Sequence, residues 1–534
     1  MAESAPNLPE APAATPALAF DDIEGARKWA KALPLLSLGQ GYAGLMAQLK
    51  ALAAATLPPR ERATLVEVLR DCALHLHTEL ARRYAGKPQP AAEREQEAAD
   101  QAIAMWHAFW EQYSLCLKPL LERDPELEGV KPKILQRGLY VGKELVLVHG
   151  LARRLPPPAL WQELHAWYRL AEMLEATVQA VSDDANPNAV GISCYSTYSH
   201  ALLLALADPC SMTVRQIEVA DRWLAQWARK VFPYAQQRET EGLLMTVDLE
   251  AGAGAALVAS PPREPPDSMR FCYPGKLATS VRGRLKRLAQ GASPAELGLG
   301  HDLSVEQSIA LLSHLDAHWY QLRRRNESES RTVELVGGGL PGAYFRVGGR
   351  TFDRKDPLGR LSYSNTQHLA TLGALTDYDR YREEAERNWP WEHWQGRYEW
   401  REASVIRVGS AHHRWFLEQL VVLRDDERTR LGAVTRVALS PSGQLAMEFK
   451  PWPGMPRAIA VRPMASAYSE DPPLPLLELV ESPEEPASAI VPPRTYAPGR
   501  VLRSMESGPE RRFRLTKLVQ RGADFERVAF EEVA

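Results

Sequence analysis

The sequence predicts an α+β protein, with an α-helical amino-terminal half followed by small β-barrels in the carboxy-terminal half. Two observations lead to this prediction. Up to about residue 232, apolar residues recur at helical spacing in one segment after another. From about residue 332 onward, short runs alternate apolar and polar residues and are separated by turn signals, a pattern typical of small barrels. The chain has 534 residues, 45% of them hydrophobic, so several domains can each bury a core.

The first 20 residues predict a disordered lead, because they are rich in Ala and Pro. They also lack the basic start and the apolar stretch of a secretion signal. No apolar run approaches the roughly 18 residues that span a bilayer, so we expect no membrane insertion. The five cysteines are widely spread and form no C-x-x-C pair, which favours a reducing cytoplasm over a disulfide framework. The formal net charge of −3 predicts no nucleic-acid partner.

Residues 21–232 predict an antiparallel helical array. The clearest helix is "TVRQIEVADRWLAQWARKVF", which begins with a capping box of Thr213 and Gln216 and continues with apolar residues at helical spacing. Four earlier segments have similar length and periodicity: roughly 60–84, 92–122, 130–154 and 159–182. Their connections carry Pro and Gly, as in "AGKPQP" and "LPPPAL". We expect this array to offer surfaces for a protein partner.

A dinucleotide-binding motif, G-x-G-x-x-G, occurs in this half at Gly39, Gly41 and Gly44. In a true site these glycines turn a strand into a helix, and an acidic residue follows about 20 positions later at the end of a second strand. Glu61 has that spacing, but the intervening residues are strong helix formers and predict no strand. We therefore interpret the motif as a connection between helices.

Residues 233–330 predict a mixed region that connects the two halves. "GLLMTVDL" and "SMRFCYP" are expected to be short strands. Two helices are expected to follow, one introduced by Ser293-Pro294-Ala295-Glu296 and the other by Ser304 with Gln307. His314 and His318 lie one turn apart in the second helix, but the Glu of H-E-x-x-H is missing, so we expect no metal site there.

Motifs for catalysis and metal binding are incomplete elsewhere too. Asp184 and Asn186 imitate the start of a calcium loop, but Ala189 and Tyr195 occupy the positions of its Gly and Glu. The chain contains no G-x-S-x-G nucleophile motif. The glycine-rich segment 334–345 lacks the Gly-Lys-Ser/Thr ending of a phosphate-binding loop. We expect a protein that is not an enzyme and that holds no cofactor or metal.

Residues 331–480 predict the first β-barrel, and residues 481–534 a carboxy-terminal β subdomain. Strands are expected in "RWFLEQLVVLRDD", "RLGAVTRVALSPSGQLAMEFKPW", "RAIAVRPM" and "RRFRLTKLVQRG". The segment "SPEEPASAIVPP" (482–493) is expected to link the two units, because it is rich in Pro and in small polar residues.

The order of strands in the first barrel resembles that of a PilZ domain, the small β-barrel receptor for the bacterial second messenger cyclic di-GMP. The residues that carry the resemblance are "EASVIR", "LEQLVVL", "LGAVTRV" and "LAMEF". The wider chain, with "VGGRTF" before the barrel and the ending "PGRVL…RLTKLVQRGADFERVAF", is similar to a group of large beta-proteobacterial proteins of PilZ type. The resemblance implies a PilZ-like barrel that binds cyclic di-GMP.

In that family an R-x-x-x-R arm before the barrel grips guanine and phosphate, and a D/N-x-S-x-x-G turn completes the site. Planar guanidinium groups form paired hydrogen bonds with guanine and with phosphate, and the Gly lets the ligand approach the backbone. The resemblance therefore implies a set of ligand-binding residues: Arg323, Arg324, Arg325, Arg331, Glu402, Ser404 and Arg407.

This ligand motif is degenerate. Glu402 stands for the Asp, Ser404 matches, and Arg407 replaces the Gly. No two of the candidate arginines have the five-residue spacing of the arm. A solvated helix end, whose positive charge complements the helix dipole, explains the arginine cluster equally well.

By resemblance, the expected function is that of a non-catalytic, cytoplasmic signalling or regulatory protein whose barrel binds cyclic di-GMP. The alternative is a helical scaffold or adaptor with a degenerate barrel that binds protein partners and no nucleotide. A hydrolase with dispersed catalytic residues is a third possibility. A deep pocket with convergent polar groups away from the barrel favours that class.

Overall fold

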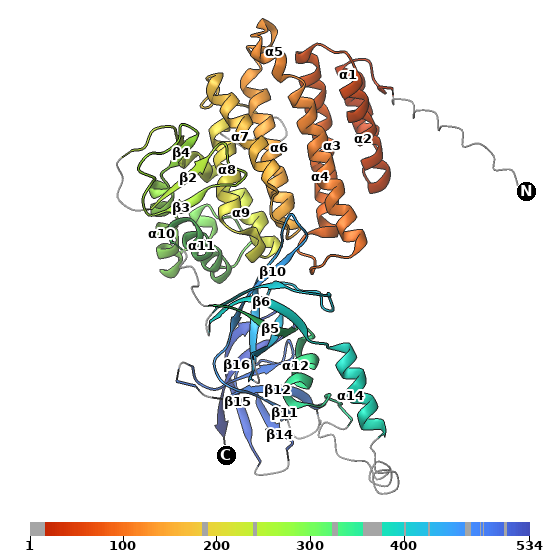
Figure 1. Ribbon diagram of the computed structural model, residues 1–534, viewed down its shortest axis with the longest axis vertical. Coiled ribbons are helices and arrows are strands. Elements are labelled where there is room, and N and C mark those ends of the chain that lie inside the picture. The colour runs from red at the N-terminus through yellow and green to blue at the C-terminus, as the bar shows by residue number, and fades with distance from the viewer. Residues whose placement is uncertain are drawn as a thin grey trace, which may run out of the picture.

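The computed structural model describes residues 17–183, 191–238, 243–322, 329–355, 376–399, 402–425, 428–464, 471–480, 482–483, 485–506 and 510–533. A largely helical body, formed by the described residues up to 322, is followed by two closed β-barrels of six strands each (Figure 1). The expected α+β class, with helices first and small barrels after them, is confirmed.

The helices of the first part run side by side in the upper part of Figure 1. They are α1 (Ile23–Ala32), α2 (Leu38–Ala54), α3 (Pro59–Tyr84), α4 (Glu93–Ser114), α5 (Leu117–Leu121), α6 (Lys131–Leu151), α7 (Pro158–Met173), α8 (Cys194–Leu206) and α9 (Val214–Trp227). The capping box at the start of α9 is confirmed, because the side chain of Thr213 accepts a hydrogen bond from the backbone N–H of Gln216.

Helix α6 is the centre of the helical body. From Ile134 to its end at Leu151, every residue except Tyr140 is buried. Its glycines let neighbouring helices approach closely: a Cβ atom on Gly138 would lie 2.2 Å from the ring of Trp167 in α7. A helix that is buried all round is rare, and here α4, α7 and α8 surround it.

The glycine motif at residues 39–44 lies inside a helix. Helix α2 begins at Leu38, so the glycines form its first turns and are not the helix connection that we expected. Their small size serves packing: the Cβ position of Gly41 is 3.2 Å from the carbonyl oxygen of Pro34, and that of Gly44 is 2.9 Å from Leu33. The dinucleotide-binding interpretation fails, because no strand precedes the motif among the described residues.

The region from 233 to 322 completes the helical body. Its strands β1 (Pro233–Tyr234), β2 (Leu244–Asp248), β3 (Ala256–Val258) and β4 (Met269–Cys272) form a sheet in the order β1-β4-β2-β3. Two helices follow, α10 (Gly275–Ala289) and α11 (Val305–Tyr320). Met245, Leu277 and Leu312 belong to the same buried core as the amino-terminal helices.

Of the two helices expected in this region, one is where the sequence placed it. The Ser304 capping box starts α11 as expected. The other prediction was wrong: the Ser293 box introduces only a three-residue 3-10 turn, Ala295–Leu297, and the long helix α10 precedes it. The turn ends at Gly298, whose φ of +68° is left-handed.

Barrel 1 is closed in the order β10-β7-β6-β5-β8-β9. Its strands are β5 (Ser330–Val336), β6 (Glu392–Glu399), β7 (Glu402–Arg407), β8 (Leu420–Asp425), β9 (Arg428–Leu439) and β10 (Leu445–Pro451). Alternate side chains point inward, as the sequence pattern requires, and among those that fill the core are Val333, Trp394, Val405, Val421 and Met447.

Barrel 2 is closed in the order β11-β12-β13-β16-β15-β14. Its strands are β11 (Pro456–Pro463), β12 (Leu474–Leu479), β13 (Ser488–Val491), β14 (Val501–Ser504), β15 (Arg512–Arg521) and β16 (Glu526–Val533). The expected boundary at residue 480 therefore differs from the change of barrel, which comes between β10 and β11. Strands β11 and β12 pair with each other and close their sheet through β13 and β14, which lie later in the chain.

Helix α12 (Gly339–Gly348) packs between the two barrels, and α14 (Thr376–Asn388) precedes β6. Leu340 and Tyr344 of α12 are buried in one cluster with Val422 of β8 and Leu477 of β12. The two barrels and this helix therefore share a core, which makes the carboxy-terminal half a single packed unit.

The helical body and barrel 1 are joined by backbone hydrogen bonds at two places. Gln89 and Trp415 exchange two N–H···O bonds of 2.7 Å each. The N–H of Leu155 donates to the carbonyl oxygen of Leu439 at 2.8 Å, and the N–H of Leu439 donates to that of Arg153 at 2.7 Å. We call this contact the joint.

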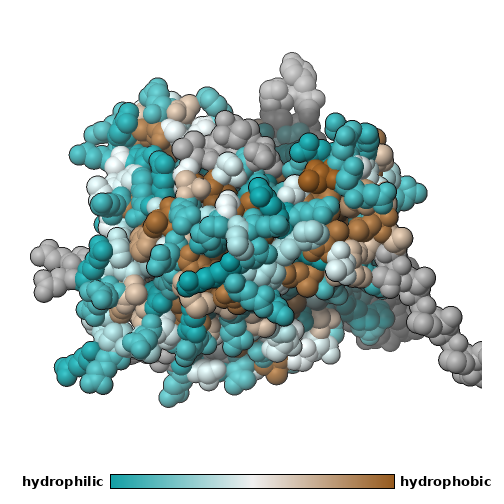
Figure 2. Space-filling model, turned by 90° about the horizontal axis from the view of Figure 1, so that it is seen from above, coloured by the Kyte–Doolittle hydropathy of each residue, from teal (hydrophilic) through white to brown (hydrophobic). Residues whose placement is uncertain are grey.

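Most of the face seen from above the helical body is hydrophilic, with apolar residues in small patches (Figure 2). Scattered apolar residues are normal on a protein surface, so this face does not by itself mark a docking site. Among the described residues, no helix combines the length and the apolar composition needed to cross a membrane.

Candidate functional site

The ligand-binding residues expected on barrel 1 are only partly within the described residues. Arg323, Arg324 and Arg325 lie outside them. The remaining candidates are Arg331 on β5 and Glu402, Ser404 and Arg407 on β7.

Strand β7 presents two of the candidates to solvent on the outer face of the barrel. Its burial alternates, with Ala403 and Val405 in the core and Glu402 and Ser404 exposed. Across the strands, Ser404 pairs with Arg397 of β6. This part of the expected site is thus accessible.

Arg331 belongs to the other side of the barrel wall. It has the same orientation as the buried core residues Val333 and Leu335, two and four positions later, and its side chain is 45% exposed near the start of β5. Its Nη1 atom is 3.1 Å from Oδ2 of Asp425, and its guanidinium group lies over the ring of Tyr398 at 5.0 Å. These contacts give Arg331 a structural role at the barrel mouth.

Arg407 has the same orientation as the core residue Val405, two positions before it. Its Nη1 atom is buried and has no hydrogen-bond partner among the described residues. The structure therefore groups Glu402 and Ser404 on one face and places neither Arg331 nor Arg407 beside them.

The outer face around Ser404 continues toward the helical body as a row of charged residues. Ser404 pairs with Glu448 of β10, and Glu448 pairs with Arg436 of β9, with 3.8 Å between Oε1 and Nε. Nε of Arg436 is 2.9 Å from Oδ2 of Asp208, which precedes a short turn of the helical body. The row thus links the candidate ligand face to the joint.

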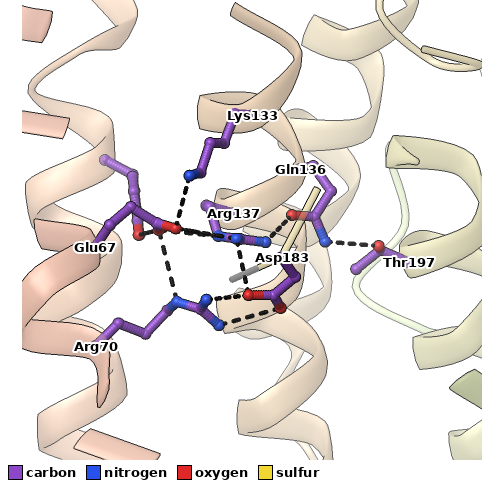
Figure 3. Close-up of polar contacts among 8 residues, drawn as sticks. Glu67, Arg70, Lys133, Gln136, Arg137, Asp183 and Thr197 are labelled. Carbon is purple, nitrogen blue, oxygen red and sulfur yellow. Dashed lines mark hydrogen bonds and ion pairs between the residues drawn. The ribbon is translucent and has the colours of Figure 1, made fainter. Parts of the chain in front are cut away.

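A second polar site, which the sequence analysis missed, lies inside the helical body. Figure 3 shows side chains from α3 and α6 converging on two carboxylates, Glu67 and Asp183. Arg137 donates to both oxygens of Glu67, at 2.9 Å and 3.0 Å, and to Asp183 at 3.2 Å. Arg70 donates to both oxygens of Asp183. We call these four residues the charged cluster.

Neighbouring polar groups hold the charged cluster in place. The hydroxyl of Tyr113 donates to Oε1 of Glu67 at 2.6 Å, and Nζ of Lys133 is 3.3 Å from Oε2. Nη1 of Arg137 donates to the side-chain oxygen of Gln136 at 2.6 Å, and Gln136 in turn donates to the hydroxyl of Thr197 at 3.0 Å. Such a network fixes the orientation of each guanidinium group.

The cluster also fixes the charge of Glu67. Burial by itself raises the pKa of a carboxyl group, but the charge and hydrogen bonds of Arg137, together with the charge of Arg70, lower the pKa of Glu67 to about 2. Burial and the charge of Glu67 raise the pKa of Tyr113 well above its usual value. At neutral pH Glu67 is therefore ionised.

The sequence contains a weak signal for this cluster. Glu67 and Arg70 are three residues apart in α3, and Lys133 and Arg137 are four residues apart in α6, so each pair lies on one helix face. Such pairs are common on solvated helices. Only the tertiary packing shows that the two faces meet and that the side chain of Arg137 has no solvent exposure.

The calcium-like positions Asp184, Asn186 and Ala189 lie outside the described residues. Among the described residues, no group of three or more His, Cys, Asp or Glu side chains is arranged to hold a metal ion. His314 and His318 stack on each other at 4.0 Å, and Nε2 of His314 lies 2.8 Å from the backbone oxygen of Ala207.

Comparison with protein families adds a finding for the helical body. Residues 24–234 match the family model described as the N-terminal domain of the cyclic-di-GMP receptor FimW. The matched residues run from α1 to β1 and include the charged cluster, and the barrels lie beyond them. Searches of curated proteins and of solved structures found no match. The expected resemblance to cyclic-di-GMP receptor proteins is confirmed over these residues, and the likeness of barrel 1 to a PilZ domain stays a prediction.

Proposed function

We propose that this chain, whose helical body is similar to a domain of a cyclic-di-GMP receptor, is a non-catalytic regulatory protein that binds cyclic di-GMP on the outer face of barrel 1. The observation that carries the regulatory role is the family match over residues 24–234, and the proposed place of the ligand site follows from the resemblance of barrel 1 to a PilZ domain. A receptor needs a site for its ligand and a surface that contacts its partner. The accessible Ser404 face provides the ligand site, and the helical body provides the surface for a protein partner in the cytoplasm.

The register of barrel 1 supports a site that combines the arginine segment with Ser404. Ser330, the first residue of β5, pairs with Arg397, and Arg397 pairs with Ser404. Adjacent strands are about 4.8 Å apart, so Ser330 and Ser404 are roughly 10 Å apart along one row. Arg325 precedes Ser330 by five residues, which is a reach of up to about 17 Å. The arginine segment is therefore long enough to cover the Ser404 face.

The chemistry of such a site follows from its residues. Arginines of the segment 323–325 supply planar donors for phosphate oxygens and for the guanine edge. The hydroxyl of Ser404 supplies a further hydrogen bond on the exposed face of β7. In the sequence this segment connects the helical body to barrel 1, so ligand binding there is expected to change how the two parts contact a partner.

Two acidic neighbours favour the alternative, a scaffold that binds protein partners and no nucleotide. Glu402 shares the outer face of β7 with Ser404, and Glu448 is the cross-strand neighbour of Ser404 on β10. Carboxylates next to a phosphate site weaken binding by repulsion. Arg407 adds no compensating charge on this face, because it has the orientation of the core residues.

Calorimetry of the full chain with cyclic di-GMP tests the proposal. We expect saturable binding in the micromolar range, about −8 kcal/mol. Replacing Arg323, Arg325 or Ser404 by Ala is expected to weaken binding, by roughly tenfold or more for each arginine, because a charged hydrogen bond is lost.

Lys517→Ala is the matched control, since it removes an exposed positive charge from β15 of barrel 2 and is expected to leave the affinity unchanged. Absence of binding by the unchanged protein favours the scaffold. Binding that survives all three substitutions shows that the ligand lies elsewhere on the chain.

A further inference from the structure

A pocket of about 410 Å³ opens in the helical body next to the charged cluster, between α1, α3 and α6. Six of its lining side chains are cationic: Arg27, Lys31, Arg60, Arg70, Lys133 and Arg137. Only two are acidic, Glu67 and Asp71. A cavity of this size is within the range of small-molecule sites, and its charge suits an anion.

The floor of the pocket is rigid. Arg70 and Arg137 are almost completely buried, and their guanidinium groups are held by Glu67 and Asp183 (Figure 3). The Nε atom of Arg70 is buried and has no hydrogen-bond partner among the described residues, and the nearest carboxylate oxygen, Oε1 of Glu67, is 3.6 Å away. Donors fixed in this way bind a ligand without a further cost in side-chain entropy.

The rim of the pocket carries positive charge that no ion pair among the described residues neutralises. Arg27 and Lys31 lie one turn apart on α1, and Arg60 lies in the first turn of α3. All three are exposed, and in the part of the chain that the structure describes none of them forms an ion pair. Like charges that converge on one cavity repel each other, and a bound anion relieves that repulsion.

The walls between floor and rim include apolar side chains. Ala63 and Val68 of α3 and Ile134 of α6 line the cavity. Apolar walls with a few convergent charges are typical of sites for organic ligands, because the walls contact the uncharged part of the molecule. The volume of about 410 Å³ suits a small molecule.

From this arrangement we infer that the helical body has a binding site of its own for a small organic phosphate, separate from the proposed site on barrel 1. The phosphate is held by the rim cations Lys31 and Arg60 and by Lys133, whose side chain is 31% exposed. The buried arginines fix the depth of the pocket. The inference does not depend on cyclic di-GMP binding to barrel 1.

Titration of the full chain with guanosine 5′-monophosphate and with inorganic phosphate tests the inference. We expect the nucleotide to bind with a dissociation constant below about 1 mM and more tightly than phosphate, because its organic part contacts the apolar walls. Reversing the rim charge with Lys31→Glu and Arg60→Glu together is expected to weaken binding by roughly tenfold or more.

Lys50→Glu is the matched control, since Lys50 is an exposed residue of α2 that does not line the pocket. It reverses one charge where the rim variant reverses two, and it is expected to leave binding unchanged. Both rim residues are exposed, so their substitution is expected to preserve the helical circular dichroism signal.

Three results would overturn the inference. One is that neither probe binds below about 1 mM. Another is that Lys50→Glu weakens binding as much as the rim reversal, which indicates unspecific attraction. The third combines two results: the unchanged protein and the rim variant bind the probes equally tightly, and the unchanged protein sediments with phosphatidylglycerol vesicles. Together they would assign the basic surface to a membrane. Cyclic di-GMP binding that depends on Ser404 is expected to persist in the rim variant, so the two sites can fail independently.

Discussion

At the scale of single residues, Arg137 is held by burial and by two carboxylates. Its side chain has no solvent exposure, and its charge is balanced by Glu67 and Asp183. A buried ion pair adds little to stability compared with apolar packing, but removing one partner leaves a charge without compensation. The ligand-binding residues predicted from the sequence and the residues of the charged cluster are therefore different. The spacing of charged residues along a helix does not show which of them are buried.

Glu67→Gln tests how much the charge balance of Arg137 contributes to stability. The substitution keeps the shape of the side chain but leaves the buried Arg137 with one carboxylate fewer, so we expect the free energy of unfolding to fall by about 3–5 kcal/mol. Urea unfolding followed by helical circular dichroism measures the change. Glu79→Gln in the same helix is the control: Glu79 pairs with the exposed Arg82, and its loss is expected to change stability by at most about 1 kcal/mol. Equal effects of the two substitutions would contradict the charged cluster as described.

The pH dependence of stability gives an independent test of the same residue. The pKa of Glu67 is lowered in the folded protein from 4.5 to about 2. A lowered carboxyl pKa stabilises the fold above the unfolded value, and this contribution is lost as the pH falls from about 5 to 2. A difference of about 2.5 pKa units corresponds to roughly 3 kcal/mol. We expect Glu67→Gln to flatten the stability profile below pH 5, and an unchanged slope would show that Glu67 is not ionised in the cluster.

At the scale of elements, the sequence predicts what depends on local order. Helix α3 follows from periodicity, α9 and α11 follow from their capping boxes, and β9 follows from alternation. Such local patterns do not show which distant segments pair or pack together. The 3-10 turn at Ala295–Leu297 has the signature of a longer helix, and the partners that close each barrel are set by strands far apart in the chain.

The same limit applies to the candidate sites. Alternation predicts that Glu402 and Ser404 share a face, and the structure places both on the outer face. That Arg331 contacts Asp425 at the barrel mouth requires knowledge of the register between β5 and β8. The basic pocket requires three helices to meet, and no spacing within one helix contains that information.

A prediction at this scale concerns the turn between β15 and β16. Asp524 accepts a hydrogen bond of 2.9 Å from the backbone N–H of Leu420, so this turn of barrel 2 contacts the start of β8 in barrel 1. Burial raises the pKa of Asp524 to about 6. Because the folded pKa lies above the unfolded value of 3.8, the fold is destabilised as the pH rises through 6 and the buried carboxyl group ionises.

Asp524→Asn keeps an acceptor for Leu420 and removes the buried charge. We expect thermal unfolding to occur at a higher temperature than in the unchanged protein at pH 8, with little difference at pH 4, which thermal scans at the two values measure. Asp471→Asn makes the same change of charge in the segment before β12 and serves as the control. A loss of stability at pH 8 would mean that the ionised carboxylate, and not its burial, holds the turn.

At the scale of the whole molecule, the joint decides whether the two halves act together. The backbone bonds of Gln89 with Trp415 and of Leu155 with Leu439 fix barrel 1 against the helical body. Arg436 adds an ion pair with Asp208 and also contacts Glu448, the neighbour of Ser404. The proposed ligand face and the helical body are thus connected through one arginine side chain.

Arg436→Gln tests this connection. Arg436 contacts both Asp208 and Glu448, so its loss removes a charged hydrogen bond between barrel 1 and the helical body. We expect amide hydrogen exchange at Leu155 and Leu439 to become faster by roughly tenfold or more, while the core of α6 exchanges as before. Mass spectrometry of peptides from these segments measures both.

Arg457→Ala, which breaks an exposed pair with Glu506 on barrel 2, is the control and is expected to leave the joint unchanged. Unchanged exchange at both joint amides in Arg436→Gln would mean that the backbone bonds alone hold the halves together, and that a ligand at Ser404 needs another route to the helical body.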